Sequence, residues 1–129
     1  MLFHTFPNQD ERRSYGGSAF IEIQFCRLPA DADIHTLTSG GSIRHWQDDS
    51  LYIDDENRFY EAYSRIFDCG FYNNQMSGTV DVYGINYYPP SCTDSLIERI
   101  RSLRPDGHEE LLAWLEKARA HNGFYILGI

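Results

Sequence analysis

The chain has 129 residues and a formal net charge of -8, a length that suits one domain at the usual ~100–200 residues per domain. Hydrophobic residues make up 42% and aromatic residues 15%, enough for a packed core, so a disordered chain is excluded. No apolar run approaches the ~18–20 residues of a membrane span, and Asp and Glu outnumber Lys and Arg nineteen to eleven. We therefore expect neither a membrane nor a direct nucleic-acid partner.

The first half of the chain predicts short strands separated by turns. The polar, turn-rich start through residue 17 predicts no regular element. Alternating apolar and polar residues then predict a strand over residues 19–28, which Pro29 ends. A Gly-Gly turn follows, and short strands are expected over residues 42–46 and 51–53.

A helix is predicted next, with Asp54 or Asp55 as its N-cap and Glu56 favourable in its first turn. Its apolar residues recur at helical spacing, and Gly70 is expected to end it. The apolar stripe consists of Phe59, Ala62, Tyr63, Ile66 and Phe67.

The second half predicts a loop, a strand, two helices and a final strand. The loop and strands are expected at residues 71–78, 79–88 and 124–129. Capping boxes place the helix starts at Ser95 and Asp106. This order predicts a single α+β domain spanning residues 1–129. We expect a two-layer sandwich with a mixed β-sheet and about three helices packed mainly on one face.

The residues that usually carry chemistry form no recognised motif. The five His are widely separated, so no metal site is expected, and the Gly turns lack the pattern of a phosphate-binding loop. We predict no cofactor and no catalytic residue. The start of the chain lacks a secretory signal, and Cys26, Cys69 and Cys92 form no CxxC pair. Free thiols and a cytoplasmic location are therefore expected.

Most of the charge imbalance lies in one quarter of the chain. Residues 29–61 hold eight acids against Arg44 and Arg58, a net charge of -6. Aromatic residues alternate with these acids, a composition that suits either a binding face for a basic partner or a core with a solvated surface. The predicted partner-binding residues are the anchors Trp46, Tyr52 and Tyr60 with the acids Asp48, Asp49, Asp54, Asp55 and Glu56.

In general character the chain resembles the bacterial immunity proteins that neutralise polymorphic toxins, including those of contact-dependent growth inhibition. The segments that prompt this resemblance are residues 46–56 (WQDDSLYIDDE), 73–78 (NNQMSG) and 122–129 (NGFYILGI). It extends over the whole chain, but no defining motif matches residue by residue, so no functional residues are carried over. The resemblance implies binding to one cognate toxin, often a nuclease.

The leading hypothesis is a non-enzymatic inhibitor, monomeric or homodimeric, that presents the acidic, aromatic segment to a basic protein. It predicts that Asp54→Lys with Asp55→Lys slows association and leaves the fold intact. One alternative is a small hydrolase or ligand-binding enzyme that uses Cys92 or a His with nearby carboxylates. That alternative requires a concave pocket with a Cys or His against an acid. A structural module in a homodimer is the other alternative.

Overall fold

The computed structural model describes residues 1–16, 19–72 and 74–128, and its centre is a six-stranded sheet. Neighbouring strands follow the order β2-β1-β6-β5-β3-β4, and every neighbouring pair is antiparallel. The strands are β1 (Ile21–Phe25), β2 (Leu51–Ile53), β3 (Gly70–Tyr72), β4 (Ser77–Gly78), β5 (Ile85–Tyr88) and β6 (Phe124–Leu127).

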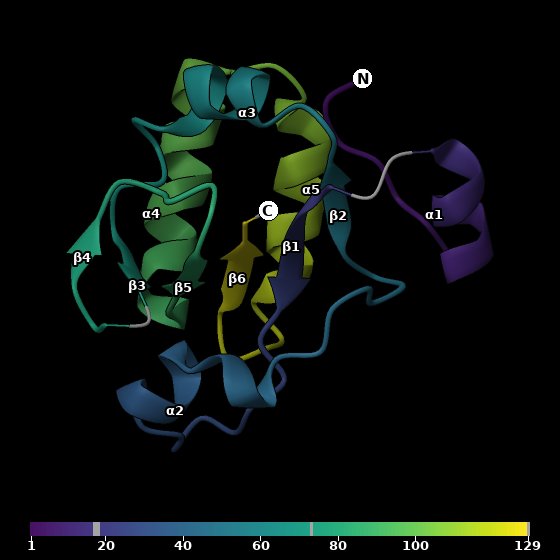
Figure 1. The fold of residues 1–129 in the computed structure, drawn as a ribbon. Helices are drawn as coiled ribbons and strands as arrows, with labels where there is room; N and C mark the ends of the chain where they lie inside the picture. Colours follow the sequence, from purple (N-terminus) through teal and green to yellow (C-terminus); the bar gives the residue numbers. More distant parts are fainter. Residues whose placement is uncertain (17–18, 73, 129) are drawn as a thin grey trace.

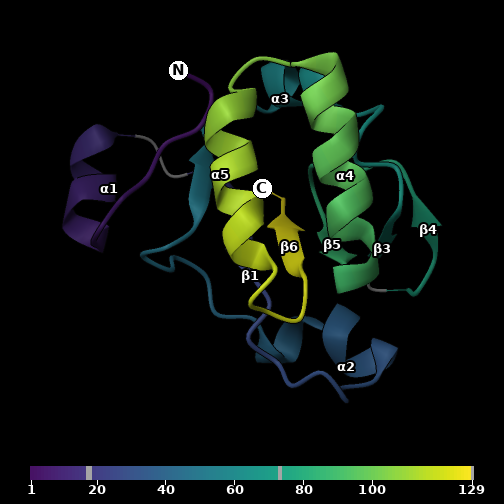
Figure 2. The same cartoon turned by 180° about the vertical axis from the view of Figure 1, so that it is seen from behind.

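Five α-helices surround this sheet in the described part of the chain. They are α1 (Gln9–Tyr15), α2 (Ile34–Thr38), α3 (Glu56–Tyr63), α4 (Pro90–Leu103) and α5 (His108–Ala118), and a 3₁₀ turn, η1, covers Gly40–Ser42. Helices α4 and α5 lie side by side over one face of the sheet, with α3 at one end of the pair (Figure 2). Helix α1 stands apart, beside β2 (Figure 1). The α+β prediction is confirmed, but the expected number of helices, about three, was too low because α1 and α2 were missed.

The prediction of a mixed sheet is wrong, and the connection between β5 and β6 gives the reason. Two helices, α4 and α5, join these strands. Two antiparallel helices bring the chain back to the end of the sheet at which it left β5. Strand β6 therefore runs beside β5 in the opposite direction. Strands β5 and β6 are therefore antiparallel, with Tyr88 opposite Phe124. A parallel pair would have required a single crossover helix.

Alternation along the strands divides the buried residues between the two faces of the sheet. Ile23 and Phe25 of β1 pack in the same core cluster as Leu115 of α5. Tyr125 of β6 packs instead with Leu37 of α2, and its hydroxyl donates to the Leu37 carbonyl oxygen at 2.5 Å. Helix α2 thus covers part of the face opposite α4 and α5, so the expectation of helices mainly on one face holds for the larger helices.

Several predicted boundaries move because local hydrogen bonds compete with the predicted strand or helix. The predicted strand over residues 79–88 is reduced to β5, because Asn86 holds residues 81–84 in a turn through hydrogen bonds with the Asp81 backbone, 2.8 Å each. Helix α4 begins at Pro90, whose fixed φ suits the first helical turn, so Ser95 lies inside the helix. Residues 71–78 were expected to be a loop but contain parts of β3 and β4; residue 73, like residue 129 of the predicted final strand, lies outside the described residues.

Both edges of the sheet are short. Strand β4 contributes two residues at one edge. At the other edge, the backbone of His4 forms a bridge with Tyr52 of β2, through two hydrogen bonds of 2.8 Å. The N-terminal segment therefore occupies the outer hydrogen-bonding groups at the middle of β2.

Removing the hydroxyl of Tyr88 is expected to stabilise the protein. Tyr88 is 0% exposed, and its hydroxyl has no hydrogen-bond partner within the described residues. A buried unpaired polar group costs ~1–3 kcal/mol, so Tyr88→Phe should raise the free energy of unfolding by about 1 kcal/mol, measured by urea denaturation. Tyr63→Phe is the matched control and should lower it by a similar amount, because the buried Tyr63 hydroxyl donates to the Asp106 carbonyl oxygen at 2.6 Å. Equal losses from both variants would contradict this prediction.

Candidate functional site

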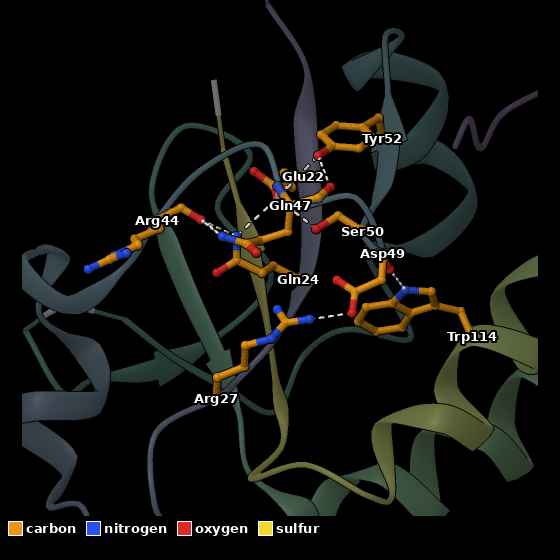
Figure 3. Close-up of polar contacts among 9 residues, drawn as sticks. All are labelled: Glu22, Gln24, Arg27, Arg44, Gln47, Asp49, Ser50, Tyr52 and Trp114. Carbon is orange, nitrogen blue, oxygen red and sulfur yellow. Dashed lines mark hydrogen bonds and ion pairs between the residues drawn. The ribbon is translucent and has the colours of Figure 1, made fainter. Parts of the chain in front are cut away.

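A buried carboxylate in β1 organises the loop that precedes β2. Glu22 is 2% exposed and accepts hydrogen bonds from the backbone nitrogens of Trp46 at 2.8 Å and Gln47 at 3.1 Å. The Ser50 hydroxyl donates to it at 2.6 Å, and the Gln24 amide at 3.0 Å (Figure 3). Burying a charge is costly unless it is well hydrogen-bonded, and here four donors lie within 3.1 Å of the carboxylate oxygens. One side chain thus holds both ends of the segment 46–50.

This arrangement explains why the strand predicted over residues 42–46 does not form. In a strand, the backbone N–H and C=O groups of these residues would bond to a neighbouring strand. Here they bond to side chains. The Arg44 carbonyl oxygen accepts from the Gln24 amide at 2.6 Å and from the Gln47 amide at 3.0 Å (Figure 3). The Trp46 backbone nitrogen donates to the Glu22 carboxylate. A 3₁₀ turn and an irregular loop replace the predicted strand.

Trp46 adopts a backbone conformation that a bulky residue rarely takes. Its φ is +66°, in the left-handed region, which costs of order 1–3 kcal/mol for a residue other than glycine. The hydrogen bond to Glu22 helps to hold it there. The indole ring lies nearly parallel to the ring of Tyr52, with centroids 5.7 Å apart, and the Arg12 guanidinium lies 3.9 Å from the indole centroid. Such strain concentrates at binding and catalytic sites.

A hollow of about 310 Å³ lies between α1 and this loop. Arg12 and Asp48 bring opposite charges to it, and neither forms an ion pair with any described residue. The Arg12 Nε atom is buried without a hydrogen-bond partner among the described residues. The lining residues are Phe6, Asn8, Gln9, Arg12, Trp46, Gln47, Asp48 and Tyr52. We call this site the Trp46 hollow.

Tyr52 requires a correction, because it cannot serve as a surface anchor. It is 2% exposed and packs with Phe6 and Phe20. Its hydroxyl donates to the Gln47 carbonyl oxygen, and burial, with the nearby Glu22 charge, raises the Tyr52 pKa well above its usual value. Tyr52 therefore forms the floor of the Trp46 hollow and supports the loop from beneath.

Three of the five predicted acids have structural partners. Asp49 pairs with Arg27, and its backbone carbonyl accepts from the Trp114 indole at 2.8 Å (Figure 3). Asp54 accepts from the Tyr15 hydroxyl at 2.8 Å. Asp55, one of the two N-caps predicted from the sequence, caps α3 and accepts from the Arg58 nitrogen at 3.0 Å. These three acids make contacts within the chain, so their charge is partly committed to local structure.

The remaining predicted residues lie on α3. Glu56 is half-buried in its first turn, and Tyr60 is 44% exposed. Helix α3 lies at the end of the α4–α5 pair, whereas α1 stands beside β2 (Figure 1). The eight predicted residues therefore come from different parts of the fold. Trp46, Asp48 and Tyr52 line one hollow.

Glu22 and Arg12 were not among the site residues predicted from the sequence. Glu22 had a usable signal, because it alternates with buried Ile21 and Ile23 and shares its sheet face with Gln24. Two neighbouring polar residues on one face of an otherwise apolar strand indicate a polar partner on that face. Arg12 had no such signal, because its contact with Trp46 joins elements far apart in the chain.

The alternative of a Cys–His hydrolase gains little from the geometry. Cys26 and His121 line a hollow of about 380 Å³, whose lining in the described chain includes no Asp or Glu. Burial raises the pKa of the Cys26 thiol, which disfavours the nucleophilic thiolate. His4, Tyr15 and Asp54 form a hydrogen-bonded cluster of titratable groups, but its contacts tie α1 to the end of β2.

Across residues 1–16, 19–72 and 74–128, no three His, Cys, Asp or Glu side chains gather in a way that could hold a metal ion. None of the helices described there has the length and apolar character of a membrane span. Comparison of the chain with protein-family models, with curated proteins and with solved structures found no match in any of the three searches.

Proposed function

We propose that this chain is a non-enzymatic binding protein of the cytoplasm that holds a basic protein through the Trp46 hollow. The resemblance to toxin-immunity proteins makes a cognate toxin, such as a nuclease, the partner class. The observation that carries the proposal is the conformation of residues 46–50, in which the buried Glu22 carboxylate fixes the half-exposed Trp46 in a strained conformation. A preorganised indole of this kind is the type of anchor that dominates the binding energy of protein interfaces.

The charge distribution favours a basic partner. The chain carries -8 overall, and Asp48 at the rim of the hollow has no counter-ion among the described residues. An acidic surface attracts a basic protein over a distance and raises the rate of encounter. The Arg12 guanidinium over the indole offers a second contact, for a carboxylate or carbonyl of the same partner.

The structure changes which acids should be tested. Asp55 caps α3 and Asp54 bonds to Tyr15, so replacing both with lysine would disturb local structure as well as charge. Asp48 is exposed and makes no hydrogen bond or ion pair with the described residues, so its replacement isolates the effect of charge.

We expect Asp48→Lys to slow association with the basic partner by roughly 3- to 10-fold at low salt and to weaken its salt dependence. The dissociation rate should change less, because rim charges act mainly on encounter. The measurement is stopped-flow association with the purified product of the neighbouring reading frame, at several ionic strengths.

Glu61→Lys is the matched control, because Glu61 is exposed on α3 and its replacement changes the net charge equally. It should slow association less than Asp48→Lys. Equal slowing by both variants would show that the overall field, and not this site, steers the partner. Unchanged association by Asp48→Lys at every ionic strength would overturn the placement of the binding site.

A further inference from the structure

Two cysteines far apart in the sequence meet where β3 begins and α4 begins. Strands β3 and β5 pair with Phe71 opposite Tyr87, and this register continued by two residues places Cys69 opposite Pro89. The strands are still in close contact near that point, because a Cβ on Gly70 would lie 2.7 Å from the Tyr88 ring. The chain preceding β3 therefore runs beside the start of α4.

Cys92 lies in the first turn of α4, directly after this meeting point. Its backbone nitrogen donates to the Pro89 carbonyl oxygen at 2.9 Å. This hydrogen bond holds Cys92 close to Pro89, the residue opposite Cys69. Both cysteines are half-buried and pack against the same apolar core cluster. The backbone thus places both cysteines where β3 and α4 begin.

An arginine on α4 braces the segment that carries Cys69. Arg99 donates to the Ile66 carbonyl oxygen at 2.9 Å and to the Asp68 carboxylate at 2.8 Å. Arg99 follows Cys92 by seven residues, about two helical turns, so both side chains lie on the same side of α4. That side of the helix therefore faces the chain at residues 66–69.

The pKa of the Cys69 thiol agrees with this placement. It is raised to about 12, chiefly by burial and next by the neighbouring Cys92 thiol. The half-buried position of each residue leaves the pair open to a small oxidant.

We propose that Cys69 and Cys92 form a reversible redox site, in which a peroxide joins the two thiols as a disulfide. The sulfur of Cys92 attacks one peroxide oxygen, the O–O bond breaks, and a sulfenic acid and one water form. The sulfur of Cys69 then displaces the sulfenic oxygen as a second water, and the S–S bond forms. Two thiols lose two electrons and two protons, and the peroxide is reduced by the same two electrons. An external dithiol reverses the reaction.

Cys26 provides an internal control for this chemistry. It is 1% exposed and belongs to a different apolar cluster, with Tyr87 and Tyr125. Its sulfur lies 3.8 Å from the Tyr125 hydroxyl. Under mild oxidation Cys26 should therefore remain a thiol while the other two cysteines react.

The test treats the full chain with hydrogen peroxide under native conditions, then unfolds it, alkylates the remaining thiols and measures its mass. We expect one alkylated cysteine in place of three, a peptide containing Cys69 linked to the peptide containing Cys92, and recovery of all three thiols with dithiothreitol. The oxidised protein should unfold at a temperature roughly 5–10 °C higher, because a cross-link across this loop restricts the unfolded chain.

Single replacements distinguish this proposal from general oxidation. Cys69→Ser and Cys92→Ser should each abolish the linked peptide and the rise in unfolding temperature, whereas Cys26→Ser should preserve both. Circular dichroism checks that each variant folds. A linked peptide that contains Cys26, a disulfide between two chains, or irreversible oxidation of Cys92 with Cys69 still free would overturn the proposal.

Discussion

Glu22→Ala is expected to lower the free energy of unfolding by about 3–4 kcal/mol. The replacement removes the acceptor for Trp46 N, Gln47 N and Ser50 Oγ, and leaves these donors unpaired beneath the loop. It also removes a hydrogen bond that helps to hold Trp46 in its left-handed conformation. Urea denaturation followed by far-ultraviolet circular dichroism measures the change.

Two further variants separate the hydrogen-bonding role of Glu22 from its charge. Glu22→Gln keeps one acceptor oxygen but places an amide donor against other donors, so an intermediate loss of about 2 kcal/mol is expected. Glu61→Ala removes an acid from an exposed position and should change stability by less than about 0.5 kcal/mol. A loss from Glu22→Ala no larger than that from Glu61→Ala would contradict the role given to the buried carboxylate.

The second large effect is expected from Gly123→Ala, which should lower the free energy of unfolding by about 3–4 kcal/mol. Gly123 has a φ of +78°, a conformation that costs an alanine about 1 kcal/mol. A Cβ there would also lie 2.1 Å from the Tyr88 carbonyl oxygen and 3.1 Å from the Pro89 Cα. Because backbone atoms form this contact, the start of β6 would have to shift. The measurement is the midpoint of thermal or urea unfolding.

Gly41→Ala is the control for this substitution. Gly41 is exposed in η1, and a Cβ there would come no closer than 3.9 Å to the Ser39 hydroxyl. We expect it to leave stability unchanged or to raise it by up to about 1 kcal/mol, because alanine restricts the unfolded chain. If Gly123→Ala matched this control, the packing of β6 against the end of β5 would have to be different.

The parts of the fold predicted from sequence are those with local signals. Asp55 caps α3, and Phe59 and Tyr63 recur at helical spacing, so this helix was placed without knowledge of the rest of the chain. The predicted stripe continued to Phe67, which is buried although the helix ends at Tyr63. Residue spacing therefore predicted burial correctly even beyond the point where the helix had ended.

Other elements depend on contacts that local patterns do not reveal. Helix α1 has no buried residue, so its sequence has no apolar stripe from which a helix could be predicted. Helix α2 spans five residues, too few for a clear period. Gly70, expected after a helix, starts β3 instead, and the Tyr88 ring occupies the space that a side chain would need there.

Of the residues predicted from composition, the structure brings Trp46 and Asp48 together at one hollow, and their role in binding stays a prediction. The roles of Asp54 and Tyr52 were not evident, because each depends on a residue from another element: Tyr15 for Asp54, and the Phe6 cluster for Tyr52. The acids predicted to share one face are therefore divided between exposed positions such as Asp48 and positions with partners inside the chain, such as Asp54.

The short edges of the sheet restrict how this protein can recognise another chain. Many peptide-binding domains add an extended strand of their ligand to an open sheet edge, and recognition then rests on main-chain hydrogen bonds. Here β4 offers two residues, and His4 already occupies the outer side of β2 at Tyr52. Strand addition has little template at either edge, which also limits sheet-to-sheet aggregation. Under the binding function proposed above, a partner is selected by the side chains on the surface, so specificity can evolve by point substitution while the backbone stays the same.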